Sequence, residues 1–244
     1  MAEAVDRVVQ HMDERLGALQ SPHHRFFLGT YLRTTAAVGK AIDEAGFEDP
    51  AWVEEWDVSF AELYLDAIDA QQDGHRNAVP RPWRLAFEAP AALPPLRHVL
   101  LGINAHVNYD LPQALLAVIS DADFDDAPLM DRRRRDHERI DGVLSSRVSA
   151  EDAELSMSGK ALLDRVLTPL NRLGSKRFLR ESRQKVWHNT MELQQARVAG
   201  ADAYQVRLAE LELLSAARIA DLLAPGQVIL RLAVAGFGVT LPPA

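Results

Sequence analysis

Cysteine is absent from the 244-residue sequence, and its absence excludes several kinds of chemistry. Disulfides, thiolate zinc sites, iron–sulfur clusters and a cysteine nucleophile all need the missing thiol. An excess of basic residues is also missing, since 27 Lys and Arg face 35 Asp and Glu for a net charge of −8. This balance argues against general nucleic-acid binding, which needs a basic face, but it permits a local basic pocket.

Long apolar runs are missing as well. No segment reaches the roughly 18 consecutive apolar residues of a membrane span, and residues 1–20 mix acids and bases without the apolar stretch of a signal peptide. We therefore expect a cytoplasmic protein that binds neither membranes nor nucleic acids.

Apolar residues recur with helical spacing nearly throughout the chain. Ser21-Pro22 and Asp49-Pro50 are typical helix starts, because Ser and Asp cap a helix and Pro is favoured at its first position. We predict one all-α domain, residues 1–244, with about eight helices. One helix begins near Ser149, and the others cover about residues 5–19, 22–45, 50–67, 95–120, 128–148, 176–199 and 201–223.

Three segments interrupt this pattern. Residues 71–95 contain five prolines and predict a long irregular connection, either a surface loop or a lid. Pro112 should kink or divide the helix that contains it. The tail, residues 225–244, is rich in Val, Leu and Gly and predicts a strand or an extended segment.

The most distinctive stretch is Gly-Ile-Asn-Ala-His-Val-Asn-Tyr-Asp-Leu-Pro, residues 102–112, which lies inside an apolar run. His106 and Asp110 would lie one helical turn apart on one face, and Asn104 and Asn108 repeat that spacing on a neighbouring stripe. Burying such groups costs several kcal/mol unless each finds a partner. The cluster therefore indicates a site.

The residue types favour acid/base chemistry. We predict His106 as general acid or base, Asp110 as the group that orients its ring or shares a metal, and Asp57 as a second base or ligand. Asp57 shares an apolar helix face with Phe60 and Tyr64, so it is either functional or holds a helix terminus or an Arg in place, and Tyr64 is one candidate partner. The alternative for the motif is a structural hydrogen-bond network at the kink.

An anionic substrate group would need a cation. Arg33, expected on the apolar side of its helix near Tyr31, would bind such a group bidentately or would pair with Asp57 or Asp110. Arg183 is a second candidate for that role. The other predicted substrate-binding residues are Tyr64, Asn104 and Asn108.

A second His-x-x-x-carboxylate pair occurs at His188 and Glu192. Two such pairs on two helices can form a metal site across a bundle. The spacing resembles the all-α zinc-dependent phospholipase C and single-strand nuclease fold, and this resemblance implies zinc-assisted phosphoester hydrolysis. Zinc or another divalent metal is thus an open alternative, with candidate ligands His106, Asp110, His188 and Glu192.

Two eye-catching charged segments are expected at the surface. The run Arg132–Arg135 covers all sides of a helix and is neutralised by its acidic neighbours, so it predicts a solvated face. His23 and His24 stand at a helix start, where exposure is the expectation.

Four segments are similar to an uncharacterised bacterial domain family common in actinobacteria, whose hallmark is a Gly-x-Asn-Ala-His-x-Asn-x-Asp-Leu-Pro helix. They are Phe47–Pro50, Trp56–Tyr64, Pro82-Trp83 and Gly102–Pro112. The resemblance spans residues 26 to about 200 and implies an all-α fold with functional residues Asp57, His106, Asn108 and Asp110. A further likeness is to an aziridine-forming cyclase of antibiotic biosynthesis, which expels sulfate.

Two function hypotheses follow. The first is a small-molecule enzyme of bacterial, specialised metabolism that removes or displaces a sulfate or phosphate ester group, with water or an internal amine as nucleophile. The second is a non-catalytic partner protein, in which the motif is structural and the tail contacts another subunit or a second copy of the chain.

Overall fold

The computed structural model describes residues 2–156 and 184–224, and every described element is a helix. The predicted all-α bundle is thereby confirmed. No described helix is long and apolar enough to cross a membrane. The elements are α1 (Glu3–Ala18), α2 (Pro22–Asp43), α3 (Pro50–Gln72), α4 (Arg81–Phe87), α5 (Pro95–Ala105), the π-helix η1 (His106–Asp110), α6 (Leu111–Val118), α7 (Asp121–Phe124), α8 (Ala127–Ser156), a helix over residues 184–199, and α10 (Ala201–Leu223).

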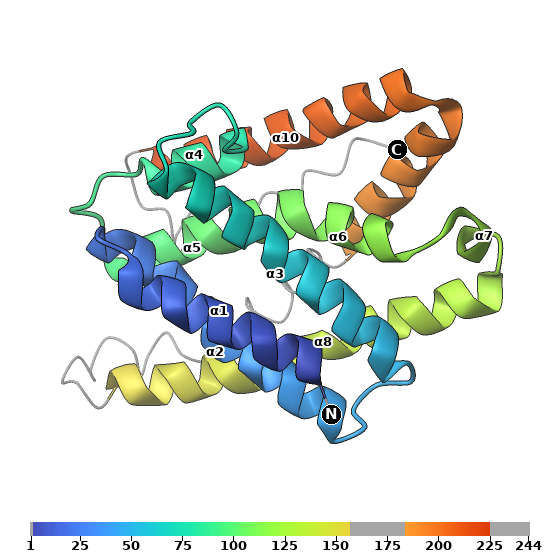
Figure 1. The fold of residues 1–244 in the computed structure, drawn as a ribbon, viewed down its shortest axis with the longest axis horizontal. Coiled ribbons are helices and arrows are strands. Elements are labelled where there is room, and N and C mark those ends of the chain that lie inside the picture. The colour runs from blue at the N-terminus through green and yellow to red at the C-terminus, as the bar shows by residue number, and fades with distance from the viewer. Residues whose placement is uncertain (1, 157–183, 225–244) are drawn as a thin grey trace.

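Helix α3 runs diagonally across the molecule, and it packs against α1, α2 and α6 (Figure 1). Helix α2 also contacts α1, α5 and α8, while α10 covers α4 and α5. The core therefore lies between α2, α3 and the continuous α5–η1–α6 segment. Its largest fully buried side chains include Trp56, Tyr64 and Trp83.

The predicted helix starts are confirmed. Pro22 and Pro50 both occupy the first turn of their helices, and the Asp49 carboxylate accepts a hydrogen bond from the Trp52 backbone nitrogen at 3.2 Å. Ser21 stands at the cap position of α2, but its side chain makes no capping bond. Proline thus decides where both helices begin.

Two predicted boundaries are wrong. The proline-rich stretch 71–95 contains α4, because Pro82 stands in its first turn, where a missing backbone N–H does no harm. Helix α8 continues through Ser149, since the chain has no proline between Pro128 and Ser156 to end it. Residues 176–183 and the tail, 225–244, lie outside the described residues.

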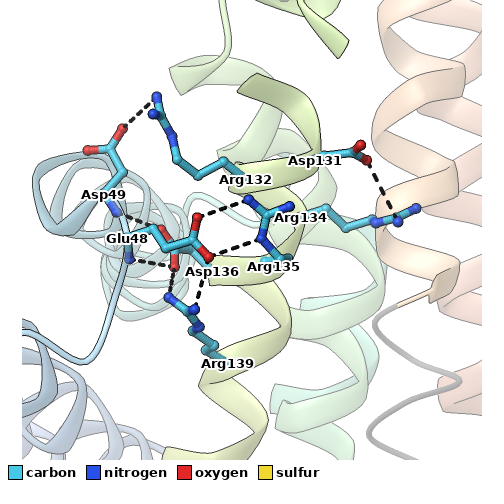
Figure 2. Close-up of polar contacts among 8 residues, drawn as sticks. All are labelled: Glu48, Asp49, Asp131, Arg132, Arg134, Arg135, Asp136 and Arg139. Atoms are coloured by element: carbon cyan, nitrogen blue, oxygen red, sulfur yellow. Dashed lines mark hydrogen bonds and ion pairs between the residues drawn. The ribbon is translucent and has the colours of Figure 1, made fainter. Parts of the chain in front are cut away.

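The arginine run of α8 anchors the connection between α2 and α3, rather than forming the purely solvated face that we predicted. Figure 2 shows Asp136 and Glu48 at the centre of this contact. The fully buried Asp136 carboxylate accepts hydrogen bonds from the backbone nitrogens of Glu48 and Asp49 at 2.8 and 2.7 Å. Glu48 in turn binds Arg135 through two hydrogen bonds of 3.0 and 2.9 Å, and Arg139 at 2.9 Å.

We predict that Asp136→Ala lowers the free energy of unfolding by about 2–4 kcal/mol, because two backbone donors lose a buried, charged acceptor. Urea denaturation measures the change. Asp131→Ala is the matched control, since Asp131 only meets the exposed Arg134 at 3.8 Å, and it should leave stability nearly unchanged. Equal losses in the two variants would contradict a structural role for Asp136.

Candidate functional site

The central motif lies in a π-helical turn. Helix α5 ends at Ala105, η1 covers His106–Asp110, and α6 follows from Leu111. The Leu111 backbone nitrogen donates to the His106 carbonyl five residues earlier, and Pro112 lies in the first turn of α6. At the place where the sequence predicts a kink or a division, the structure has a π-turn inside one continuous helical segment, and such π-turns are frequent at functional sites.

His106, Asp110 and Trp83 form a buried hydrogen-bonded triad. Nδ1 of His106 lies 2.7 Å from Oδ2 of Asp110, and the indole nitrogen of Trp83 donates to that same oxygen at 2.8 Å. When Asp110 is ionised, Oδ2 accepts from both groups, which puts the imidazole proton on Nδ1 and leaves the lone pair on Nε2. This is the geometry of an oriented imidazole base.

Five aromatic rings surround the imidazole, and we call them the aromatic cage. The ring of Phe60 stacks on His106 with centroids 3.5 Å apart, and the ring of Tyr31 meets it edge-on at 4.5 Å. The cage residues are Phe27 and Tyr31 from α2, Phe60 and Tyr64 from α3, and Trp83 from α4. The site therefore combines side chains from α2, α3 and α4 with those of the motif.

Burial inside the cage sets the ionisation of the triad. Desolvation holds the pKa of His106 well below its usual range, and it raises the pKa of Asp110 despite the opposing hydrogen bond from Trp83. Nε2 of His106 is buried and has no hydrogen-bond partner among the residues that the structure describes. The imidazole is therefore neutral and offers an unused lone pair.

Asp57 and Tyr64 are both buried on α3, as the sequence predicts, but Tyr64 is not the hydrogen-bond partner of Asp57. Asp57 is buried on α3, one turn before Phe60, and its charge adds to the effect of burial in raising the pKa of Tyr31. Tyr64 is fully buried, burial raises the pKa of its phenol, and its hydroxyl makes no hydrogen bond to any described group. The structure thus brings Asp57, Tyr64, His106 and Asp110 into one region.

The two asparagines serve the helix backbone. The side-chain amide of Asn104 donates to the Leu100 carbonyl at 2.8 Å, and that of Asn108 donates to the Asn104 carbonyl at 2.9 Å. These bonds satisfy carbonyls around the π-turn, where the regular ladder is disturbed. They agree with the structural alternative for these two residues.

The expected position of Arg33 is wrong. Its side chain is exposed, and it donates to the Thr30 hydroxyl at 3.4 Å. Two residues after Tyr31, a helix has turned by about 200°, so the two side chains face opposite sides. Arg183 lies outside the described residues.

The described residues do not assemble the second pair into a metal centre. His188 is exposed, and Glu192 lies 4.0 Å from Nε of Arg207. Within residues 2–156 and 184–224, no group of three or more His, Asp and Glu side chains is placed to hold an ion. His106 and Asp110 are bonded to each other instead.

Of the aromatic cage, only Tyr64 is predicted as a site residue from the sequence, and Trp83, Phe27, Tyr31 and Phe60 are not. Trp83 follows Pro82 at the start of α4, so its single buried donor was hidden in a stretch expected to be irregular. The sequence signal for this contact was Trp83 directly after Pro82, a residue that favours the start of a helix. A buried Trp nitrogen usually finds a hydrogen-bond acceptor, so such a Trp predicts a polar partner. Asp110 is that acceptor.

A second histidine group lies where α2 begins, and it corrects the expectation that His24 is exposed. His24 is buried and its Nε2 lies 3.0 Å from the Phe87 carbonyl, while the rings of His23 and the buried His98 are 5.2 Å apart. Burial is the main cause that lowers the pKa of both His24 and His98. These two rings therefore resist protonation in the folded protein.

We predict that this group makes the protein less stable in mild acid. The unfolded chain takes up these protons near pH 6.5, before the folded protein does, so stability falls as the pH drops below that value. Each histidine contributes at most about 1.4 kcal/mol per pH unit. Melting curves between pH 8 and 5 measure this slope, which should become shallower in a His24→Gln/His98→Asn variant. An unchanged slope would contradict the assignment.

The chain belongs to DUF5995, a family of unknown function, which matches residues 5–225. This membership is consistent with the uncharacterised domain family expected from the sequence, and it extends further toward both ends than residues 26–200. No curated protein and no solved structure matches the chain.

Proposed function

We propose that this DUF5995 member is a small-molecule enzyme in which His106 acts as an acid/base group. The observation that carries the proposal is the unused Nε2 lone pair of a neutral imidazole whose Nδ1 is held by Asp110. A base aligned by a carboxylate on its other nitrogen recurs in acid/base catalysis.

The roles within the site follow from the contacts. Asp110 fixes the imidazole tautomer, and Trp83 positions Asp110 through the second hydrogen bond to Oδ2. The low pKa of His106 keeps its imidazole unprotonated at neutral pH, which is the state that a general base needs. Asp57, beside Tyr31, is the second carboxylate of the site.

The reaction that we favour is removal or displacement of a sulfate or phosphate ester group from a small molecule in bacterial, specialised metabolism. His106 would take the proton of the nucleophile, which is water in hydrolysis or an internal amine in ring closure. In ring closure, the amine attacks the ester carbon, the carbon–oxygen bond breaks, and sulfate or phosphate departs with that oxygen. In hydrolysis, water attacks sulfur or phosphorus, the bond from that atom to the ester oxygen breaks, and the protonated His106 returns its proton to the departing alkoxide. Zinc-assisted hydrolysis remains the alternative reaction, and it would need ligands in addition to His106 and Asp110.

A non-catalytic role is the second candidate. The side-chain amides of Asn104 and Asn108 donate to backbone carbonyls, and His106 is buried. In that case the triad stabilises the π-turn, and the protein acts through a partner. Changes at His106 would then affect stability or complex formation alone.

The test is release of sulfate or phosphate from a panel of amino-alcohol sulfate and phosphate esters, followed by ion chromatography. We expect His106→Asn to remain folded and to lose roughly 10²–10⁴-fold in rate. His75→Asn, at an exposed histidine, is the matched control and should keep full activity. Equal rates for the two variants, or no turnover of any ester by the unaltered protein, would favour the non-catalytic role.

A further inference from the structure

Arg218, on the C-terminal half of α10, holds an unsatisfied guanidinium edge. Its Nε and Nη2 atoms are both buried and have no hydrogen-bond partner among the residues that the structure describes. Two buried guanidinium donors without an acceptor are costly, and burial lowers the pKa of Arg218 although the charge of Asp221 opposes this effect. Such a group calls for a ligand of opposite charge.

The same edge binds carboxylates elsewhere in this chain. Arg15 uses Nε and Nη2 to hold Asp69 at 2.9 and 2.6 Å. Arg76 holds Glu88 at 2.7 and 2.8 Å with the same two nitrogens, and Arg135 holds Glu48 in the same way. This fork matches two oxygens of one carboxylate, phosphate or sulfate group. Arg218 has the same two nitrogens available, and no described residue accepts a hydrogen bond from either of them.

Two further cations lie near this end of α10. Lys185 is partly buried, and the charge of Arg218 adds to burial in lowering the pKa of its ammonium. Arg97, from α5, donates to the carbonyl of Leu222, one turn after Arg218. Asp221, the acid whose charge acts on Arg218, is itself exposed. Three cations and one acid therefore give this end of α10 a positive local charge, although the net charge of the chain is −8.

We propose that Arg218 and Lys185 form a binding site for an oxyanion, the phosphate or sulfate group of a free ion or of a small-molecule ester. Nε and Nη2 of Arg218 would donate to two oxygens of the group, and the Lys185 ammonium would neutralise its remaining charge. The opposing explanation is that the negative end of the α10 dipole alone stabilises both cations. The site does not depend on the acid/base role of His106.

Calorimetric titration of the full chain with inorganic phosphate, sulfate and phenyl phosphate, at constant ionic strength, tests the proposal. We expect saturable binding by the unaltered protein and at least tenfold weaker binding by Arg218→Met and by Lys185→Met. Arg76→Met is the matched control and should bind as the unaltered protein does, because Glu88 already occupies its fork. Tighter binding of phenyl phosphate than of inorganic phosphate would identify an ester as the ligand. Equal binding of the two would identify a free ion as the ligand.

A melting experiment keeps the proposal testable if one variant folds poorly. Phosphate should raise the melting temperature of the unaltered protein but not that of Arg218→Met, which should itself be at least as stable without anion. No binding of any of the three anions, or equal stabilisation of both proteins by phosphate, would overturn the proposal. A large loss of stability in Arg218→Met without anion would also overturn it, since the helix dipole or a carboxylate of the chain would then already satisfy the guanidinium.

Discussion

Asp110→Ala should lower the free energy of unfolding by about 3–5 kcal/mol, the largest effect that we expect from a single polar substitution in this protein. The change removes the one acceptor shared by Trp83 Nε1 and His106 Nδ1, and both donors are buried where water cannot replace it. It also leaves a cavity beside the aromatic cage. Urea denaturation, monitored by tryptophan fluorescence and circular dichroism, measures the loss.

A double-mutant cycle tests the physical reason. Trp83→Phe removes one donor and keeps an aromatic ring, so Asp110→Ala should cost less in the Trp83→Phe background. We expect a coupling energy of about 1–3 kcal/mol between the two positions. Additive losses would show that the indole hydrogen bond is not what makes Asp110 important for stability.

Gly102→Ala should destabilise the protein by about 3 kcal/mol or more, although alanine is the better helix former. A Cβ atom at Gly102 would lie 2.3 Å from Cγ and Cδ2 of the Phe27 ring and 2.9 Å from its Cβ. Since the Phe27 Cβ is attached to the α2 backbone, α2 and α5 would have to move apart. Thermal and urea denaturation measure the effect.

Gly142 provides the matched control for this prediction. It lies within α8, and a Cβ atom there meets nothing within 4 Å, so Gly142→Ala should be neutral or stabilising by up to about 1 kcal/mol. In a Gly102→Ala/Phe27→Ala double variant, the total loss should be smaller than the sum of the single losses, because the ring no longer clashes. A Gly102→Ala variant as stable as Gly142→Ala would refute the close approach of α2 and α5.

The sequence predicts the helices well wherever proline or apolar spacing decides the outcome. Pro22 and Pro50 begin α2 and α3 as expected, and Val5, Val8 and Met12 are the buried face of α1. The errors arise where a local rule has two readings. Proline can end a helix but can also start one, so the prolines of residues 71–95 did not reveal α4. Ser149 was expected to cap a new helix, but no proline or glycine beside it ends α8.

The site is predictable only in part, for a geometrical reason. His106 and Asp110 are four residues apart, so their contact follows from helical spacing alone. The contacts of His106 with Phe60, and of Asp110 with Trp83, join separate helices, and no spacing along the chain encodes them. Arg135 illustrates the same limit, since its carboxylate partner Glu48 lies 87 residues away.

The π-turn also sets the rotational phase between α5 and α6, which run along one path but bury different faces. A residue added to or removed from an α-helix rotates everything beyond it by about 100°. Because the π-turn holds one residue more than an α-helical turn, removing Val107 would restore a regular α-helix and keep α6 in its present phase. An added residue has no such outlet, so it would rotate α6 and turn the buried Leu111 and Leu115 out of the core. Chains with this fold should therefore tolerate the loss of one residue between His106 and Asp110 better than the gain of one, although a loss would also change the spacing that joins the two side chains.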